Sequence, residues 1–100
     1  MRVYISGPMT GYPEYNYPAF HAAEADLTAL GYDVLNPARH PVASGMTWAD
    51  YLRADLADVI LADAVALLPG WEASRGARLE VHVAHALGMS TLPIAQFGRP

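Results

Sequence analysis

Glu80 is a carboxylate at a position where a helix is expected to be apolar. The segment that begins at Ser74 has helical spacing, and one of its faces holds residues three or four apart. These residues are Ala77, Glu80, Ala84 and Leu87. Because an unpaired buried carboxylate is strongly disfavoured or takes up a proton, three interpretations remain. Glu80 is functional, it is paired with an arginine, or the helical phase is wrong by one residue.

Asp55 and Tyr4 are the other polar side chains expected to point inward. Asp55 lies between apolar residues of a second helical segment, so the same alternatives apply to it. Tyr4 alternates with Val3 and Ile5 in a β-like run and could be plain core. A buried tyrosine hydroxyl needs a hydrogen-bond partner, however, and a carboxylate would serve.

The remaining acidic residues and the histidines give no site of their own. The helical and strand patterns predict that four acidic residues face solvent: Glu24, Asp26, Asp33 and Asp58. Asp63 is expected at the polar beginning of a strand. The histidines lack the neighbours of a metal-ligand set: His21, His40, His82 and His85. We therefore predict no metal site.

Two residues and one loop could contact an anion or a base. Ser74 is expected to be a helix N-cap, and an N-cap serine after a central strand is also a place where a phosphate docks. The loop at residues 7–11 carries glycines but does not match a dinucleotide-binding or P-loop motif, so its signal is weak. Trp71 follows a buried strand and could stack on a base or cap the core.

The composition is that of a globular domain. The chain has 100 residues, of which 53% are hydrophobic and 16% charged, and this predicts a single domain over residues 1–100. The longest apolar run, at residues 64–68, is far shorter than the roughly 20 residues of a membrane span. The absence of cysteine excludes disulfides and thiolate metal sites. We expect a cytoplasmic protein without a membrane partner.

The charge pattern argues against a nucleic-acid partner. The net charge is −4, and the six basic residues are all arginines, scattered singly along the chain. Such a pattern offers no basic stripe to hold a nucleic-acid backbone, although one or two arginines could hold a single phosphate. The absence of lysine excludes Schiff-base and P-loop lysine chemistry.

Strand-like and helical segments alternate along the chain. Strands are expected at residues 2–6, 32–35, 64–68 and 90–95, and helices at about 18–30, 48–59 and 74–87. A capping box at Thr47 and Asp50 begins the second helix. This alternation predicts a three-layer α/β sandwich around a small parallel sheet. Ligands of such sheets bind beyond the carboxyl ends of the strands, at the loops 7–17, 36–46 and 69–73.

Four short motifs occur in one order and spacing. They are the run YISGPMTG at residues 4–11, Asn36-Pro37, Asp55 eight residues before Asp63, and Ser74-x-Gly76-x-x-x-Glu80. Together they resemble the nucleoside 2-deoxyribosyltransferase superfamily, whose relatives include deoxynucleoside 5′-monophosphate N-glycosidases and small, often phage-borne, members. The resemblance covers nearly the whole chain, and it is the co-occurrence of the motifs that is specific.

The resemblance implies a flavodoxin-like or Rossmann-like sheet of about four to five strands and an enzyme that needs no cofactor. Glu80 matches the nucleophile that forms a glycosyl-enzyme ester, Tyr4 the hydroxyl that favours its charged form, and Asp55 the aspartate at the sugar or leaving base. Substrate-binding residues are expected at the motif positions and after the buried strand: Ser6, Gly7, Pro8, Met9, Asn36, Trp71, Ser74 and Gly76.

The chain departs from the family's two patterns in different places. Ser74 stands where the transferases carry an aspartate, and it matches the hydrolases, in which a serine binds the 5′-phosphate. Pro8 and Thr10 stand where the hydrolases carry a serine and an arginine, and Arg75 or Arg78 could replace these.

We therefore expect cleavage of the N-glycosidic bond of a (deoxy)nucleoside 5′-monophosphate. The alternatives are base exchange by a deoxyribosyltransferase and a nucleotide-binding module without catalysis. A receiver-like signalling domain is disfavoured, because Gly7-Pro8 and Pro69-Gly70 stand where its acidic pair and phosphoacceptor would be. By the resemblance, the partner is a small nucleoside or nucleotide, and the chain forms a homodimer or larger homo-oligomer.

Overall fold

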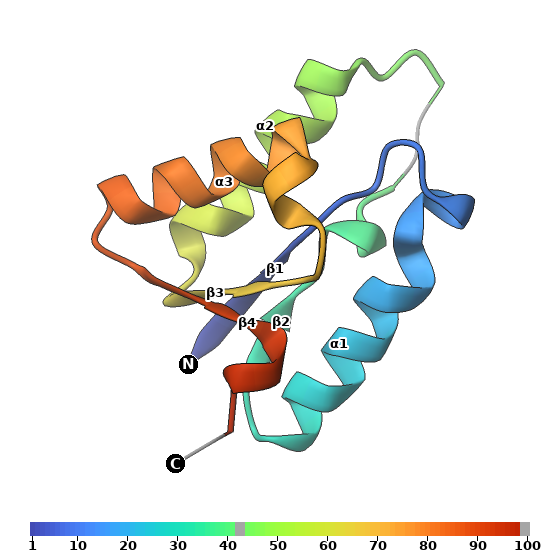
Figure 1. The fold of residues 1–100 in the computed structure, drawn as a ribbon. Helices are drawn as coiled ribbons and strands as arrows, with labels where there is room; N and C mark the ends of the chain where they lie inside the picture. Colours follow the sequence, from blue (N-terminus) through green and yellow to red (C-terminus); the bar gives the residue numbers. More distant parts are fainter. Residues whose placement is uncertain (42–43, 99–100) are drawn as a thin grey trace.

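A four-stranded parallel sheet forms the middle of the molecule (Figure 1). The computed structural model describes residues 1–41 and 44–98. The strand order is β2-β1-β3-β4, so β1 and β3 are central. The bounds are β1 (Arg2–Ser6), β2 (Asp33–Leu35), β3 (Ala64–Leu67) and β4 (Ser90–Pro93).

Helices cover both faces of this sheet, as the predicted three-layer α/β sandwich requires. Helix α1 (Tyr17–Ala29) lies on one face, while α2 (Trp48–Leu61) and α3 (Arg75–Ala86) lie side by side on the other (Figure 1). Short 3-10 helices fill the connections: η1 (Pro13–Asn16), η2 (Pro37–Arg39), η3 (Trp71–Ala73) and η4 (Ile94–Gln96). The predicted fold class is confirmed. No described helix is long and apolar enough to cross a membrane.

The predicted element boundaries differ from the observed ones by a few residues. The last strand ends at Pro93 instead of Ala95, because the chain turns there into η4. The predicted capping box is present: the Thr47 hydroxyl accepts from the Asp50 amide, and the Asp50 carboxylate accepts from the Thr47 amide. Residues 42 and 43 of the expected loop 36–46, and residues 99 and 100, lie outside the described residues.

The alternation of side chains along β1 divides the core into two clusters. Val3 and Ile5 pack with Phe20 and Leu27 of α1. Tyr4, between them, points to the opposite face and packs with residues of α2 and α3. Because successive side chains of a strand point to opposite faces, Ser6 belongs to the same face as Tyr4. The strand thus presents two hydroxyl groups to the α2–α3 layer.

Gly7 allows the end of β1 to approach the end of β3. A Cβ at Gly7 would lie 2.7 Å from Leu68 Cβ, a separation that requires the backbone to move. A Cβ at Gly76, in the first turn of α3, would meet nothing closer than Trp48 at 4.0 Å. The two glycines therefore offer a matched pair of substitutions.

We predict that Gly7→Ala lowers the free energy of unfolding by about 2 kcal/mol, the usual cost of overpacking a core. Gly76→Ala should leave the stability unchanged or raise it, because alanine is favoured over glycine inside a helix. Urea denaturation of both variants measures this. Equal midpoints for the wild type and Gly7→Ala would contradict the close approach of β1 and β3.

Candidate active site

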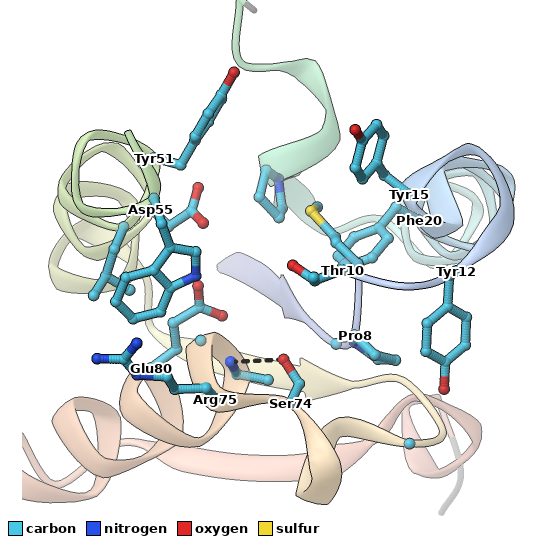
Figure 2. A pocket seen from close by; sticks show the side chains of 18 of the residues that line it. Pro8, Thr10, Tyr12, Tyr15, Phe20, Tyr51, Asp55, Ser74, Arg75 and Glu80 are labelled. Atoms are coloured by element: carbon cyan, nitrogen blue, oxygen red, sulfur yellow. Dashed lines mark hydrogen bonds between the residues drawn. The ribbon is translucent and has the colours of Figure 1, made fainter. Parts of the chain in front are cut away.

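A cavity of about 750 Å³ lies beyond the carboxyl ends of β1 and β3 (Figure 2). The loop after β1, the beginning of α1, helix α2 and the beginning of α3 form its walls. Its volume is in the usual range for sites that bind small molecules. The predicted position of the site, at the carboxyl edge of the sheet, agrees with this cavity.

Glu80 lies at the base of the cavity and is only 5% exposed. The Tyr4 hydroxyl donates a hydrogen bond to its Oε2 at 3.0 Å, and the Ser6 hydroxyl donates one to its Oε1 at 2.7 Å. Burial, and then the charge of Glu80, raise the pKa of Tyr4 well above 10.0, so its hydroxyl stays protonated and able to donate. Both carboxylate oxygens of Glu80 thus have a partner from β1, and the arginine pairing considered from the sequence is wrong.

The helical pattern that turned Glu80 inward is confirmed. Ala77, Glu80, Val81 and Ala84 form the buried face of α3. Leu87, which was expected on that face, is 55% exposed, because α3 ends at Ala86 and Leu87 is its C-cap. Small alanine side chains on both sides of Glu80 let the helix lie close to the sheet.

Asp55 of α2 lines the cavity beside Glu80, and the two carboxyl groups lie within hydrogen-bonding reach of each other. Burial, and then the negative charge of Asp55, raise the pKa of Glu80 to about 8. Burial likewise raises the pKa of Asp55 to about 6, although His40 opposes the shift. Because two nearby carboxyls do not both ionise readily, the pair holds one proton near neutral pH.

His40 and Asp58 belong to this site, although the sequence did not indicate either. The His40 ring lines the cavity, and its Nε2 lies 2.9 Å from Asp58 Oδ2 and 3.5 Å from Asp55 Oδ1. The prediction that Asp58 faces solvent is wrong, and the acidic neighbours of His40 were not foreseen. One signal was present in the sequence: Asp58 lies three residues after Asp55, so the two share a helix face.

Glu24 was also expected to face solvent, and this is wrong as well. It is partly buried, accepts a hydrogen bond from Asn36 Nδ2 at 3.0 Å and forms an ion pair with Arg39. Hydrogen bonding by Arg39 is the main cause that lowers the pKa of Glu24. Arg39 is therefore engaged on the α1 side and does not enter the cavity.

Aromatic side chains line two facing sides of the cavity. Tyr15 and Phe20 come from the side of η1 and α1, while Tyr51 comes from α2 (Figure 2). Trp48, the first residue of α2, also lines the cavity. The Arg75 guanidinium lies over the Trp48 ring at 4.1 Å from its centroid. A planar ring held between such walls would gain stacking contacts on its faces.

Ser74 caps α3, as the sequence predicted. Its Oγ accepts a hydrogen bond from the Ala77 amide at 3.2 Å, and the residue also lines the cavity together with Arg75 and Gly76 (Figure 2). The first turn of α3 therefore faces the same space as Glu80. A helix N-terminus carries unpaired amides and a partial positive charge, both of which favour an anion.

Two predicted binding residues lie apart from the cavity. The Asn36 carbonyl oxygen accepts from the Ala38 amide at 2.9 Å and its amide group donates to Glu24, so this side chain holds the turn at η2. Trp71, in η3, packs against the core cluster around Tyr4 and Val65. Neither is among the described residues that line the cavity.

The other predicted residues lie in or directly beneath the cavity. Tyr4 and Ser6 lie beneath it and donate hydrogen bonds to Glu80. The rest line it: Gly7, Pro8, Met9, Asp55, Ser74, Gly76 and Glu80. Within residues 1–41 and 44–98, no group of three or more histidine and acidic side chains is arranged to hold a metal ion.

The chain matches the family described as "Domain of unknown function (DUF4406)" over residues 1–92. Because the match spans most of the sequence, the chain belongs to this family. Its structure is also similar to that of a 2-deoxyribosyltransferase from the psychrotolerant bacterium Bacillus psychrosaccharolyticus, with a TM-score of 0.70 and 19% sequence identity. The similarity covers 91% of this chain and 69% of that one. No functionally curated protein matches the sequence.

The structural similarity agrees with the fold that the resemblance of the sequence motifs implied. At 19% identity this similarity shows a common fold. The four-stranded parallel sheet with helices on both faces is that of the deoxyribosyltransferase.

We predict that Glu80 makes the stability of the protein fall as the pH rises. Its pKa is about 8 in the folded protein and near 4.5 in the unfolded chain. Between these values the folded state binds more protons, so stability is lost as the pH rises toward 8. Relative to Glu80→Gln, the free energy of unfolding of the wild type should fall by about 3 kcal/mol between pH 5 and pH 8.

Urea denaturation at several pH values measures this difference. Glu72→Gln is the control, because Glu72 is an exposed glutamate at the beginning of the segment that leads into α3. Parallel pH dependences of the wild type and Glu80→Gln would contradict the raised pKa of Glu80.

Proposed function

We propose that this protein cleaves the N-glycosidic bond of a (deoxy)nucleoside 5′-monophosphate, with Glu80 as the nucleophile. The observation that carries the proposal is a buried carboxylate at the base of a cavity, bound by two hydroxyl donors and beside a second carboxyl. A leucine would be more stabilising at position 80, so a carboxylate there needs a reason of this kind.

In the first step, a Glu80 oxygen attacks C1′ of the sugar. A C1′–O bond forms, the C1′–N bond breaks, and its electron pair leaves with the base. Asp55 donates a proton to the departing base. Hydrogen bonds from Tyr4 and Ser6 hold the attacking carboxylate in place and favour its charged form before attack.

In the second step, water attacks C1′ of the glycosyl ester while Asp55 accepts its proton, and Glu80 leaves as a carboxylate. A second base in place of water would give transfer instead of hydrolysis. The direct interaction between the Asp55 and Glu80 carboxyl groups, which affects both pKa values, supports the covalent route. Inverting glycosidases hold their carboxyls about 6.5–9.5 Å apart to leave room for water between them.

The single proton of the Asp55–Glu80 pair suits this chemistry once it lies on Asp55. The pKa values, about 8 for Glu80 and about 6 for Asp55, place it on Glu80 in the free protein, so the proposal requires the proton to pass to Asp55 when substrate binds. One carboxyl must be charged to attack, and the other must be protonated to assist the leaving base. Burial raises both pKa values, and the charge of Asp55 raises the pKa of Glu80 further, which favours a singly protonated pair near neutral pH.

The walls of the cavity support a nucleotide as substrate. The base would stack between the aromatic side chains of α1 and α2, which places the sugar over Glu80. The 5′-phosphate would then lie at the beginning of α3, against Ser74 and Arg75. Thr10, across the cavity, offers a further hydroxyl.

Base exchange between nucleosides is the second candidate activity. The structural similarity to a 2-deoxyribosyltransferase favours it, and its first chemical step would be the same. Ser74 and Arg75 favour the monophosphate, because neither would have an anionic partner in an uncharged nucleoside. The expected homodimer or larger oligomer remains a prediction, which light scattering tests.

We expect the wild type to release free base from nucleoside 5′-monophosphates, and Glu80→Gln to lose at least about 1,000-fold of this activity. Chromatography of a panel of nucleosides and monophosphates, with and without an acceptor base, measures release and exchange. Base exchange from nucleosides would favour the transferase. Binding of nucleotides without any release would favour the non-catalytic alternative and contradict the role of Glu80.

Arg75→Ala should raise the KM for monophosphates about tenfold and leave the turnover of nucleosides unchanged, since only the phosphate would lose a partner. Arg78→Ala is the matched control, because Arg78 lies one turn later on α3, exposed and away from the cavity wall. Equal KM values for the two variants would contradict a phosphate site at the beginning of α3.

A further inference from the structure

We propose that His40, held by Asp58, is a positioning residue for Asp55: it orients the Asp55 carboxyl and determines how readily that group gives up and takes back a proton. The proposal rests on the proposed function, since Asp55 is the proton donor there. It adds two residues, from the loop after β2 and from α2, that none of the sequence motifs includes.

The geometry places the His40 imidazole between two carboxylates. Its Nε2 is 2.9 Å from Asp58 Oδ2 and 3.5 Å from Asp55 Oδ1, and all three side chains are largely buried. Nε2 is buried and makes no well-aligned hydrogen bond to any described residue. It is therefore close enough to act on both carboxylates and is not committed to either one.

The surroundings leave His40 as the nearest candidate cation for this cluster. Asp55 and Asp58 project from the same face of α2, Glu80 faces Asp55 from α3, and the Tyr4 hydroxyl approaches from β1. Arg39, the neighbour of His40 in the chain, is paired with Glu24. Arg75 lies over Trp48 at the wall of the cavity. The His40 imidazole thus lies beside two carboxyl groups, and a third, that of Glu80, faces Asp55.

In this position, His40 can act on Asp55 during the step in which the base leaves. Asp55 becomes an anion when it protonates the base, and a neighbouring imidazolium stabilises that anion. In the protein without substrate, His40 lowers the pKa of Asp55, whereas burial raises it. Asp58 would hold the ring in place, because its carboxylate is the nearer of the two.

The test compares His40→Gln with the wild type. Glutamine can place a neutral amide near the position of Nε2, so it preserves much of the contact and removes the charge. We expect kcat to fall at least about tenfold while KM changes less than about twofold. The acid limb of the kcat profile should move up by about one pH unit, because the pair then ionises at higher pH.

His82→Gln is the matched control, since His82 is exposed on the outer side of α3. Asp58→Asn should also lower kcat. This second variant keeps the proposal testable if His40→Gln does not fold. Asp26→Asn, at an exposed site on α1, is its control. A lower kcat with an unmoved acid limb in His40→Gln would assign His40 a purely structural role and overturn the proposal.

A measurement without substrate separates this proposal from the proposed function. Carboxyl carbon NMR titrates Asp55 and Glu80 in the wild type and in His40→Gln. Absence of base release by the wild type would overturn the function alone. An Asp55 titration that moves to higher pH in His40→Gln would support the coupling, and an unmoved titration would overturn it.

Discussion

The burial of one carboxylate against β1 is the constraint on which the site depends. Glu80 can lie inside only because Tyr4 and Ser6 point to the same face of the strand and each donates to one of its oxygens. Their spacing of two residues is the period of a strand. Helix α3 must then lie close to the sheet, which the small residues Ala77 and Ala84 on its buried face permit.

The region around this interaction brings several carboxyl groups together, which is electrostatically unfavourable. Three carboxyl groups from two helices face one small region, and burial raises the pKa values of two of them, Asp55 and Glu80. The hydroxyl groups beneath Glu80 and the imidazole beside Asp55 offset part of that cost. Such local conflict is usual where a protein needs reactive groups, since function and maximal stability favour different residues.

The chain shares its fold with a 2-deoxyribosyltransferase and belongs to a family described only as a domain of unknown function. A fold by itself does not determine an activity. Chemistry is indicated instead by the site: a buried pair of interacting carboxyl groups, a cavity with aromatic walls, and a helix N-terminus that faces the same space.

The spacing of residues close together in the sequence was enough to predict many features of this protein. Helical and strand periods predicted the α/β layers, the inward position of Glu80, the N-cap at Ser74 and the capping box at Thr47, because each depends on residues a few positions apart. Only the tertiary structure decided that His40 meets Asp58, and that Asn36 and Trp71 lie outside the cavity. Those positions depend on how loops distant in sequence meet at the edge of the sheet, and no periodic pattern records such a meeting.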